Sequence, residues 1–133
     1  MPHQPHNPER LAKPVGQYAH ALEVQVQSRL LFISGQIPGA EGTNAIPAAF
    51  DDQAALIWTN IGHILRTAHM DVTDIVKVTT YLTHPDQAQQ NSVIRQQFLG
   101  NHTPALTVVV VQLLDSRWLL EVEVIAAQAA ASP

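Results

Sequence analysis

The apolar residues of this chain change their spacing from one segment to the next, and the order of those changes restricts the fold. From Ala21 to Val26 apolar and polar residues alternate, which is typical of a half-buried strand. Between Phe50 and Ala68 the apolar residues instead recur every three or four positions, as they do on an amphipathic helix. A chain of 133 residues that uses both periods predicts a single α+β domain.

The remaining segments complete this order. Arg29 to Ser34 predicts a second strand that forms a hairpin with the first, and Pro47 stands where the first turn of the long helix would tolerate a proline. The later elements are a strand over Asp74 to Leu82, a helix from His84 to Gly100, and strands over Ala105 to Gln112 and Trp118 to Ala127. The order ββαβαββ predicts a mixed sheet with both helices on one face.

The two ends of the chain lack either period. Residues 1–14 contain four prolines together with His3 and His6, so we expect a flexible arm there. The single domain is expected over residues 15–128, and residues 129–133 form a tail that we expect to be frayed.

The face of the sheet that the helices leave open is predicted to lie against other subunits. In the last strand Glu121 and Glu123 alternate with the apolar row of Leu120, Val122 and Val124, so the second face is only partly polar. Charged residues make up 14% of the chain, compared with about 25% in an average domain. Both observations favour an oligomer.

Several classes of partner and cofactor are disfavoured. The net charge is −4 and the seven lysines and arginines do not cluster, which argues against nucleic-acid binding. The longest apolar run, Ala105 to Val111, is too short to span a membrane, and no signal peptide is recognisable, so we expect a cytoplasmic protein. The chain has no cysteine and its histidines lack metal-ligand spacing, so no metal site is predicted.

Short motifs spread over most of the domain give the chain a family resemblance. It resembles the Rid (YjgF) family, small proteins related to the enamine/imine deaminase RidA. The motifs that carry this resemblance are Gly16-Gln17-Tyr18, Ser34-Gly35-Gln36-Ile37-Pro38, Gln53-Ala54, Asn60, Asp74 to Thr79, Asn91, Pro104-Ala105 and Glu121 to Ala126.

The resemblance implies a chorismate-mutase-like fold and a homotrimer whose sheets surround a central barrel, with small-molecule clefts between subunits. It also implies hydrolysis of a reactive enamine or imine to a carbonyl compound and ammonia, without metal or cofactor. By the same resemblance Glu121 and Tyr18 are the catalytic residues, and Ser34, Gly35, Asn91 and Thr107 line the cleft. The residues alone favour the alternative that Glu121 makes a hydrogen bond between subunits or lies on a solvated face.

One position departs from the family. Deaminating members read Pro-Ala-Arg, and their arginine binds the substrate carboxylate, whereas this chain reads Pro104-Ala105-Leu106. Leu106 would make that end of the cleft apolar. Arg117 or Arg95 could supply a replacement charge from another subunit, the alternative for each being a solvated surface arginine.

Two hypotheses follow. The first is a Rid-like hydrolase whose substrate differs from the usual carboxylate-bearing imines of amino acids. The second is a non-catalytic trimeric protein that binds a small molecule or a partner on the same scaffold.

Overall fold

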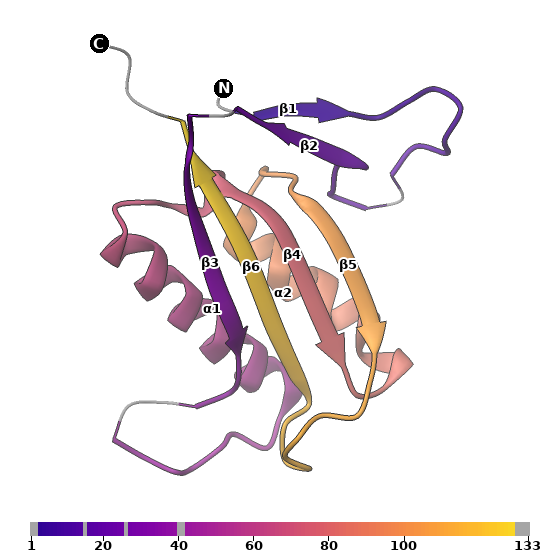
Figure 1. The fold of residues 1–133 in the computed structure, drawn as a ribbon. Coiled ribbons are helices and arrows are strands. Elements are labelled where there is room, and N and C mark those ends of the chain that lie inside the picture. The colour runs from indigo at the N-terminus through magenta and orange to yellow at the C-terminus, as the bar shows by residue number, and fades with distance from the viewer. Residues whose placement is uncertain (1–2, 15, 26, 40–41, 130–133) are drawn as a thin grey trace.

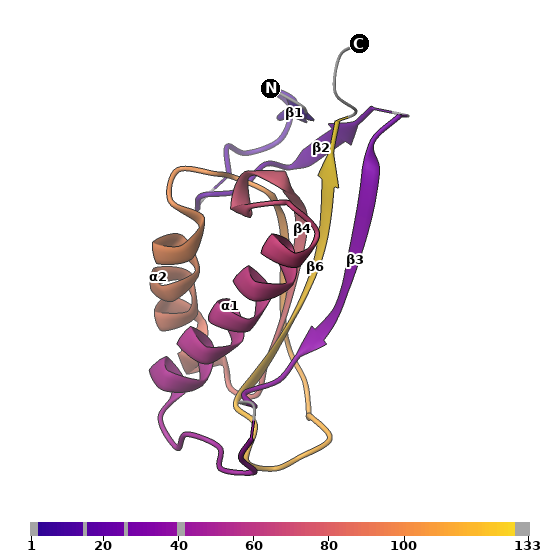
Figure 2. The same ribbon diagram turned by 90° about the vertical axis from the view of Figure 1, so that its left-hand side faces the viewer.

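The computed structural model describes residues 3–14, 16–25, 27–39 and 42–129, and its centre is a four-stranded sheet (Figure 1). The strand order is β3-β6-β4-β5, in which β4 and β5 are parallel and the other neighbours antiparallel. The strands are β3 (Arg29–Gln36), β4 (Ile75–Leu82), β5 (Ala105–Val110) and β6 (Leu120–Gln128). Both helices, α1 (Phe50–Thr67) and α2 (Ala88–Leu99), lie on one face of this sheet, which confirms the predicted mixed sheet and layer order (Figure 2).

The long helix α1 forms where the 3.6-residue period predicts it. Its buried side chains include Ile57, Trp58, Ile61 and Leu65, which belong to the hydrophobic core. The helix begins at Phe50, so Pro47 lies before the helix and not in its first turn. The carbonyl of Pro47 instead accepts a hydrogen bond of 2.7 Å from Nε2 of Gln53.

The second helix is preceded by a short 3₁₀ turn. His84 precedes η2 (Pro85–Gln87), and α2 starts only at Ala88, because this proline-containing segment takes the tighter turn first. Gly100 ends α2 with a φ of 61°, a conformation that glycine adopts without steric cost, as expected of a helix stop. A second short turn, η1 (Val72–Asp74), leads into β4.

The N-terminal segment differs from the prediction in two ways. His3–His6 form a strand, β1, which pairs antiparallel with β2 (Ala21–Val24), so part of the expected flexible arm is ordered. The predicted hairpin between the first two domain strands is wrong, because β2 pairs with β1 and β3 pairs with β6. A two-residue hairpin loop favours Gly, Asn or Asp at positive φ, and Gln27-Ser28 offers none of these.

The core lies between the helices and one face of the sheet. In β6 the alternating residues Leu120, Val122 and Val124 are fully buried, whereas Glu123 on the opposite face is exposed. That second face, called the open face below, carries Phe32 at 70% exposure. In the described ranges no helix combines the length and the apolar character needed to cross a membrane.

Candidate functional site

A glutamate and a glycine on neighbouring strands make a close contact on the open face. The pairing of β3 with β6 shifts register between Ile33 and Gln36, so the backbone bulges at Ser34-Gly35. A Cβ atom placed on Gly35 would overlap the Glu121 carboxylate, lying 2.8 Å from its Cδ and 3.1 Å from its Cγ. Glu121 therefore occupies space that only glycine leaves free at position 35.

Two further side chains surround Glu121. Tyr81 of β4 is the register partner of Glu121, and its hydroxyl donates a hydrogen bond of 3.1 Å to Oε1 of Glu123. This hydrogen bond, then burial, then the negative charges of Glu123 and Glu121 raise the pKa of Tyr81. The phenol is therefore held protonated beside the two carboxylates, and it can donate a hydrogen bond.

This group borders a shallow cavity of about 300 Å³. Besides the two glutamates and Tyr81, its wall is made by the start of the loop 111–119, including Gln112 and Leu113. Sequence reasoning did not assign Tyr81 to the site. The alternation of residues 74–82 could have indicated Tyr81, because it sets this residue on the same face as Lys77 and Thr79.

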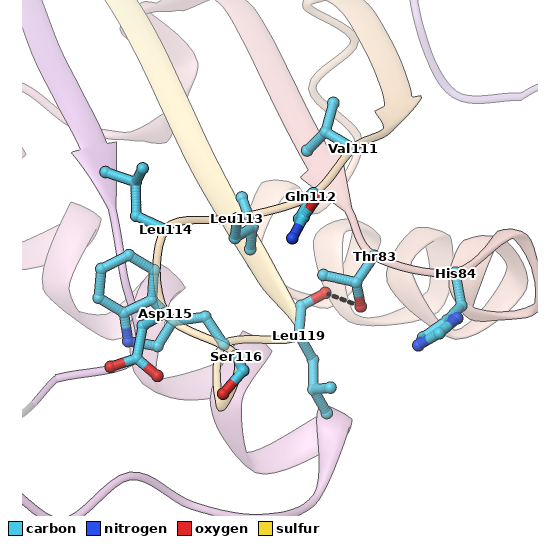
Figure 3. A pocket seen from close by; sticks show the side chains of 10 residues that line it. Thr83, His84, Val111, Gln112, Leu113, Leu114, Asp115, Ser116 and Leu119 are labelled. Carbon is cyan, nitrogen blue, oxygen red and sulfur yellow. Dashed lines mark hydrogen bonds between the residues drawn. The ribbon is translucent and has the colours of Figure 1, made fainter.

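A larger hollow of about 490 Å³ lies along the same loop (Figure 3). Its polar lining residues include Thr83, His84, Asp115 and Ser116, and apolar side chains of the loop such as Leu113 and Leu114 complete it. Oγ1 of Thr83 donates a hydrogen bond of 3.1 Å to the carbonyl of Leu119. The hollow contains none of the residues that the sequence predicted for the site, and no hydrogen bond joins His84 to Asp115. We therefore place the candidate site at Glu121.

Of three further predicted site residues, Ser34 lies beside the Glu121 site, whereas Thr107 and Tyr18 lie on β5 and next to its start. Ser34 is exposed at the bulge beside Gly35. Thr107 is exposed on β5, where its hydroxyl accepts 2.6 Å from Nζ of Lys77. Tyr18 lies next to the start of β5, because its neighbour Ala19 forms a β-bridge with Ala105. Its half-buried ring packs edge-on against the ring of His20, with the two ring centroids 5.8 Å apart.

Leu106 lies on the helix-covered face of β5. It pairs with Val78 in the parallel register and packs, half-buried, against the core. Glu121 pairs with Tyr81, three residues further along β4, and lies on the open face. Within one chain the two residues are thus about 10 Å apart along the strands and on opposite faces of the sheet.

Asn91 and Arg95 are buried on α2, at 1% and 4% exposure. The alternative that Arg95 is a solvated surface arginine is therefore wrong, because one helical turn after Asn91 it shares the helix face that is turned inward. Burial lowers the pKa of Arg95.

Arg117, in contrast, is exposed in the loop 111–119. Its Nη2 and Nε contact the Asp115 carboxylate at 2.7 and 3.1 Å. Hydrogen bonds from the Arg117 side chain and backbone lower the pKa of Asp115 to about 2. The guanidinium of Arg117 is thus already engaged within the chain.

Known proteins resemble this chain over nearly its full length. The sequence model of the family described as endoribonuclease L-PSP matches residues 9–128. A RutC family protein of Pyrococcus horikoshii is 33% identical over 119 residues, which cover 89% of this chain and 92% of that protein. TdcF of Escherichia coli, named as a candidate reactive intermediate deaminase, is 31% identical over 125 residues, covering 92% and 95%.

Solved structures agree with the sequence comparison. The Rid family protein YyfB of Yersinia pestis has a TM-score of 0.84 at 27% identity, covering 96% of this chain and all of that one. TdcF, solved with bound serine, has a TM-score of 0.71 at 31% identity, covering 95% and 99%. The molecule is an α+β protein with the chorismate-mutase-like fold. The chain belongs to the Rid (YjgF) family.

Proposed function

We propose that this protein is a hydrolase of a small reactive enamine or imine, which it converts to a carbonyl compound and ammonia. The observation that carries this proposal is the Glu121 carboxylate, held in the space that Gly35 leaves free and bordering an open cavity. TdcF supports it, because that relative is named for deamination of reactive intermediates and was solved with serine, a small amino acid.

The active unit in this proposal is a homotrimer. Leu30 and Phe32 are 55% and 70% exposed on β3, at one edge of the sheet, and Val110 at the end of β5, the other edge strand, is 50% exposed. Large apolar side chains exposed on both edge strands favour coverage by another copy of the chain. A neighbouring copy would also explain why the predicted site residues are apart within one chain, because it could bring its Tyr18 and the β5 edge that carries Leu106 toward the Glu121 of the first.

The proposed reaction needs a base and no redox step. Glu121 takes a proton from water while the water oxygen bonds to the imine carbon, and it returns that proton to the imine nitrogen. In the resulting carbinolamine Glu121 passes the hydroxyl proton to the amine nitrogen, so that the C–N bond breaks, ammonia leaves and the C=O bond forms. An enamine enters the same sequence after protonation at carbon. Tyr81 would have to release Glu123 before its hydroxyl could donate a hydrogen bond near the developing charge.

Whether the cleft binds a substrate carboxylate depends on where the positively charged side chains lie. Leu106 suggests an uncharged or apolar ligand end in place of a carboxylate, which was the expectation from the sequence. That expectation assumed that Arg95 is solvated, whereas the structure buries it. We therefore keep hydrolysis of an imine or enamine as the proposed reaction, and we leave both substrates with a carboxylate and substrates without one in the proposal.

Ammonia release from freshly generated imines tests the proposal. The panel should contain imines with and without a carboxylate, and Glu121→Gln should lose turnover on every active substrate while remaining folded. Failure of the parent to act on any of them would favour the alternative, a non-catalytic binding protein, which the departure at position 106 also favours.

A nuclease is not proposed, although the family description carries that word. The net charge is −4, Arg95 is buried, and Arg117 is engaged by Asp115, so few cations remain to track a phosphate backbone. The cytoplasm is proposed as the location on the sequence prediction alone.

A further inference from the structure

A buried glutamine on α1 joins this helix to two other segments of the chain. Gln53 is 1% exposed, and its amide nitrogen donates hydrogen bonds of 2.7 Å to the carbonyl of Pro47 and 2.9 Å to the carbonyl of Arg117. Its amide oxygen accepts a hydrogen bond of 2.8 Å from the backbone N–H of Leu119. Both amide hydrogens and the oxygen are therefore used, by the segment before α1 and by the end of the loop 111–119.

The loop that Gln53 holds is a wall of the candidate site. Its first residues line the cavity of about 300 Å³ that Glu121 borders, and most of the loop lines the larger hollow of about 490 Å³ (Figure 3). Leu119, which donates to Gln53, lies two residues before Glu121 in the sequence. A shift of this end of the loop would therefore change both the shape of the cavity and the start of the strand that carries Glu121.

The other attachments of this loop lie on the side of the sheet. The N–H of Val111 donates 2.8 Å to the carbonyl of Leu82, and the N–H and hydroxyl of Thr83 donate 3.2 and 3.1 Å to the carbonyl of Leu119. These contacts tie the loop to the end of β4. Within the described part of the chain, only the hydrogen bonds of Gln53 join the loop to α1.

A second amide on α1 provides an internal comparison. Asn60, about two helical turns after Gln53, donates a hydrogen bond of 2.9 Å to the carbonyl of Gly39. Its side chain makes no hydrogen bond to the loop 111–119 in the described ranges. Both amides thus hold the segment that precedes α1, but Gln53 also holds the wall of the site.

We propose that Gln53 is a positioning residue for the reaction at Glu121, because it fixes the loop that shapes the cavity. An apolar side chain at position 53 would leave the carbonyls of Pro47 and Arg117 and the N–H of Leu119 without these partners, which favours another position of the loop. A displacement of about 1 Å near the reacting groups can reduce turnover by about 100-fold. This inference rests on the proposed function and concerns the same site.

Gln53→Met and Asn60→Leu form a matched pair, since each replaces an amide on α1 with an apolar side chain of similar size. Gln53→Met should lower ammonia release per folded molecule by about tenfold or more and should speed amide hydrogen exchange in the loop 111–119. Asn60→Leu should keep the parent's turnover and the parent's exchange in this loop. If the parent releases no ammonia from any imine, the proposed function fails. If the parent is active and Gln53→Met matches it in turnover or in loop exchange, the positioning role alone is wrong.

Gln53→Glu provides a second test should Gln53→Met fail to fold. As a neutral acid the new carboxyl can accept from Leu119 and donate to one of the two carbonyls, whereas the ionised form meets both carbonyl oxygens without a donor. Burial and these oxygens should raise its pKa above the ordinary value of about 4.3. The contribution of this hydrogen bond is then present below the ordinary pKa and is lost as the pH rises through the raised folded-state pKa.

The readout is the turnover of Gln53→Glu divided by that of the parent at the same pH, each per folded molecule. This ratio should fall as the pH rises from about 5 to about 8, because the carboxyl ionises and the loop loses its donor. A residue that only stabilises the fold would leave the turnover of the folded molecules unchanged. A ratio near one at every pH would therefore overturn the proposal.

Discussion

The carboxylate of Glu121 lies where a side chain on Gly35 would have to be. A Cβ at position 35 would come within 2.8 Å of Cδ of Glu121, and the bulge in β3 between Ile33 and Gln36 brings the two strands into this relation. The glycine is therefore required for the position of the glutamate, and not for an unusual backbone angle. A side chain at position 35 should therefore displace the Glu121 carboxylate.

Gly35→Ala is expected to lower activity far more than stability. The new methyl group must displace the end of a flexible side chain, which is a small cost to the fold, but a displacement of about 1 Å at a reacting group can reduce turnover by about 100-fold. Ammonia release and thermal melting measure the two effects. Gly39→Ala is the matched control, because a Cβ there meets nothing within 4 Å. Unchanged turnover in Gly35→Ala would contradict the role given to this contact.

The phenol of Tyr81 should titrate above its ordinary pKa of 10.0, because its hydrogen bond to Glu123 and the nearby negative charges favour the protonated form. Since the folded-state pKa is raised, this contribution to stability is present below pH 10 and is lost as the pH rises through the folded-state pKa. Ultraviolet difference titration of the parent, compared with Tyr81→Phe, isolates this group. Glu123→Gln should move the titration to lower pH, and an unmoved titration would show that the hydrogen bond has no effect.

Light scattering of the parent is expected to give three times 14.5 kDa, or about 43.5 kDa. Phe32→Asp should shift the population toward monomer, because it places a charge in the middle of a surface that we propose is covered. Leu11→Asp, at a residue that is 50% exposed outside the sheet, should leave the mass unchanged. If light scattering finds the parent to be monomeric at micromolar concentration, the protein has no cleft between subunits and this part of the proposal is contradicted.

The stability of the protein should depend on both the charge and the volume of the side chain at position 106. Leu106→Ala removes half-buried packing against the core and is expected to cost about 1 to 2 kcal/mol in urea unfolding. Leu106→Arg should cost more when no anion is present, since it adds a second guanidinium to the face that buries Arg95. If pyruvate binds to Leu106→Arg, adding it should restore part of the lost stability, and the amount restored should follow the extent of binding. A Leu106→Arg protein as stable as the parent would mean that position 106 faces water.

The sequence predicted the layers of the fold because burial follows the hydrophobic period. Ile57, Ile61 and Leu65 recur at helical spacing and are buried, and Leu120, Val122 and Val124 alternate and are buried. The strand β1 was missed because His3–His6 carry no apolar alternation, and its order comes from pairing with β2 and from the 2.8 Å contact of His3 with the carbonyl of Ala127.

The site was only partly predictable for a related reason. Alternation set Glu121 and Tyr81 on one face, but the register that makes them partners depends on pairing between strands far apart in the chain. The burial of Arg95 could not be foreseen, since a charged residue on a helix is usually solvated. Its position is explained by the inward-facing row of Asn91, Arg95 and Leu99 on α2.

Turnover by Glu121→Gln tests the central claim most directly. Glutamine keeps the shape and hydrogen-bonding capacity of the side chain but cannot accept the proton from water, so ammonia release per folded protein should fall by about 100-fold or more, with the melting temperature and molecular mass nearly unchanged. Glu23→Gln, which removes a surface carboxylate paired with His6, should retain the parent's rate. If Glu121→Gln dissociates or melts well below the parent while each remaining folded molecule turns over normally, Glu121 is a structural residue and the proposed mechanism is contradicted.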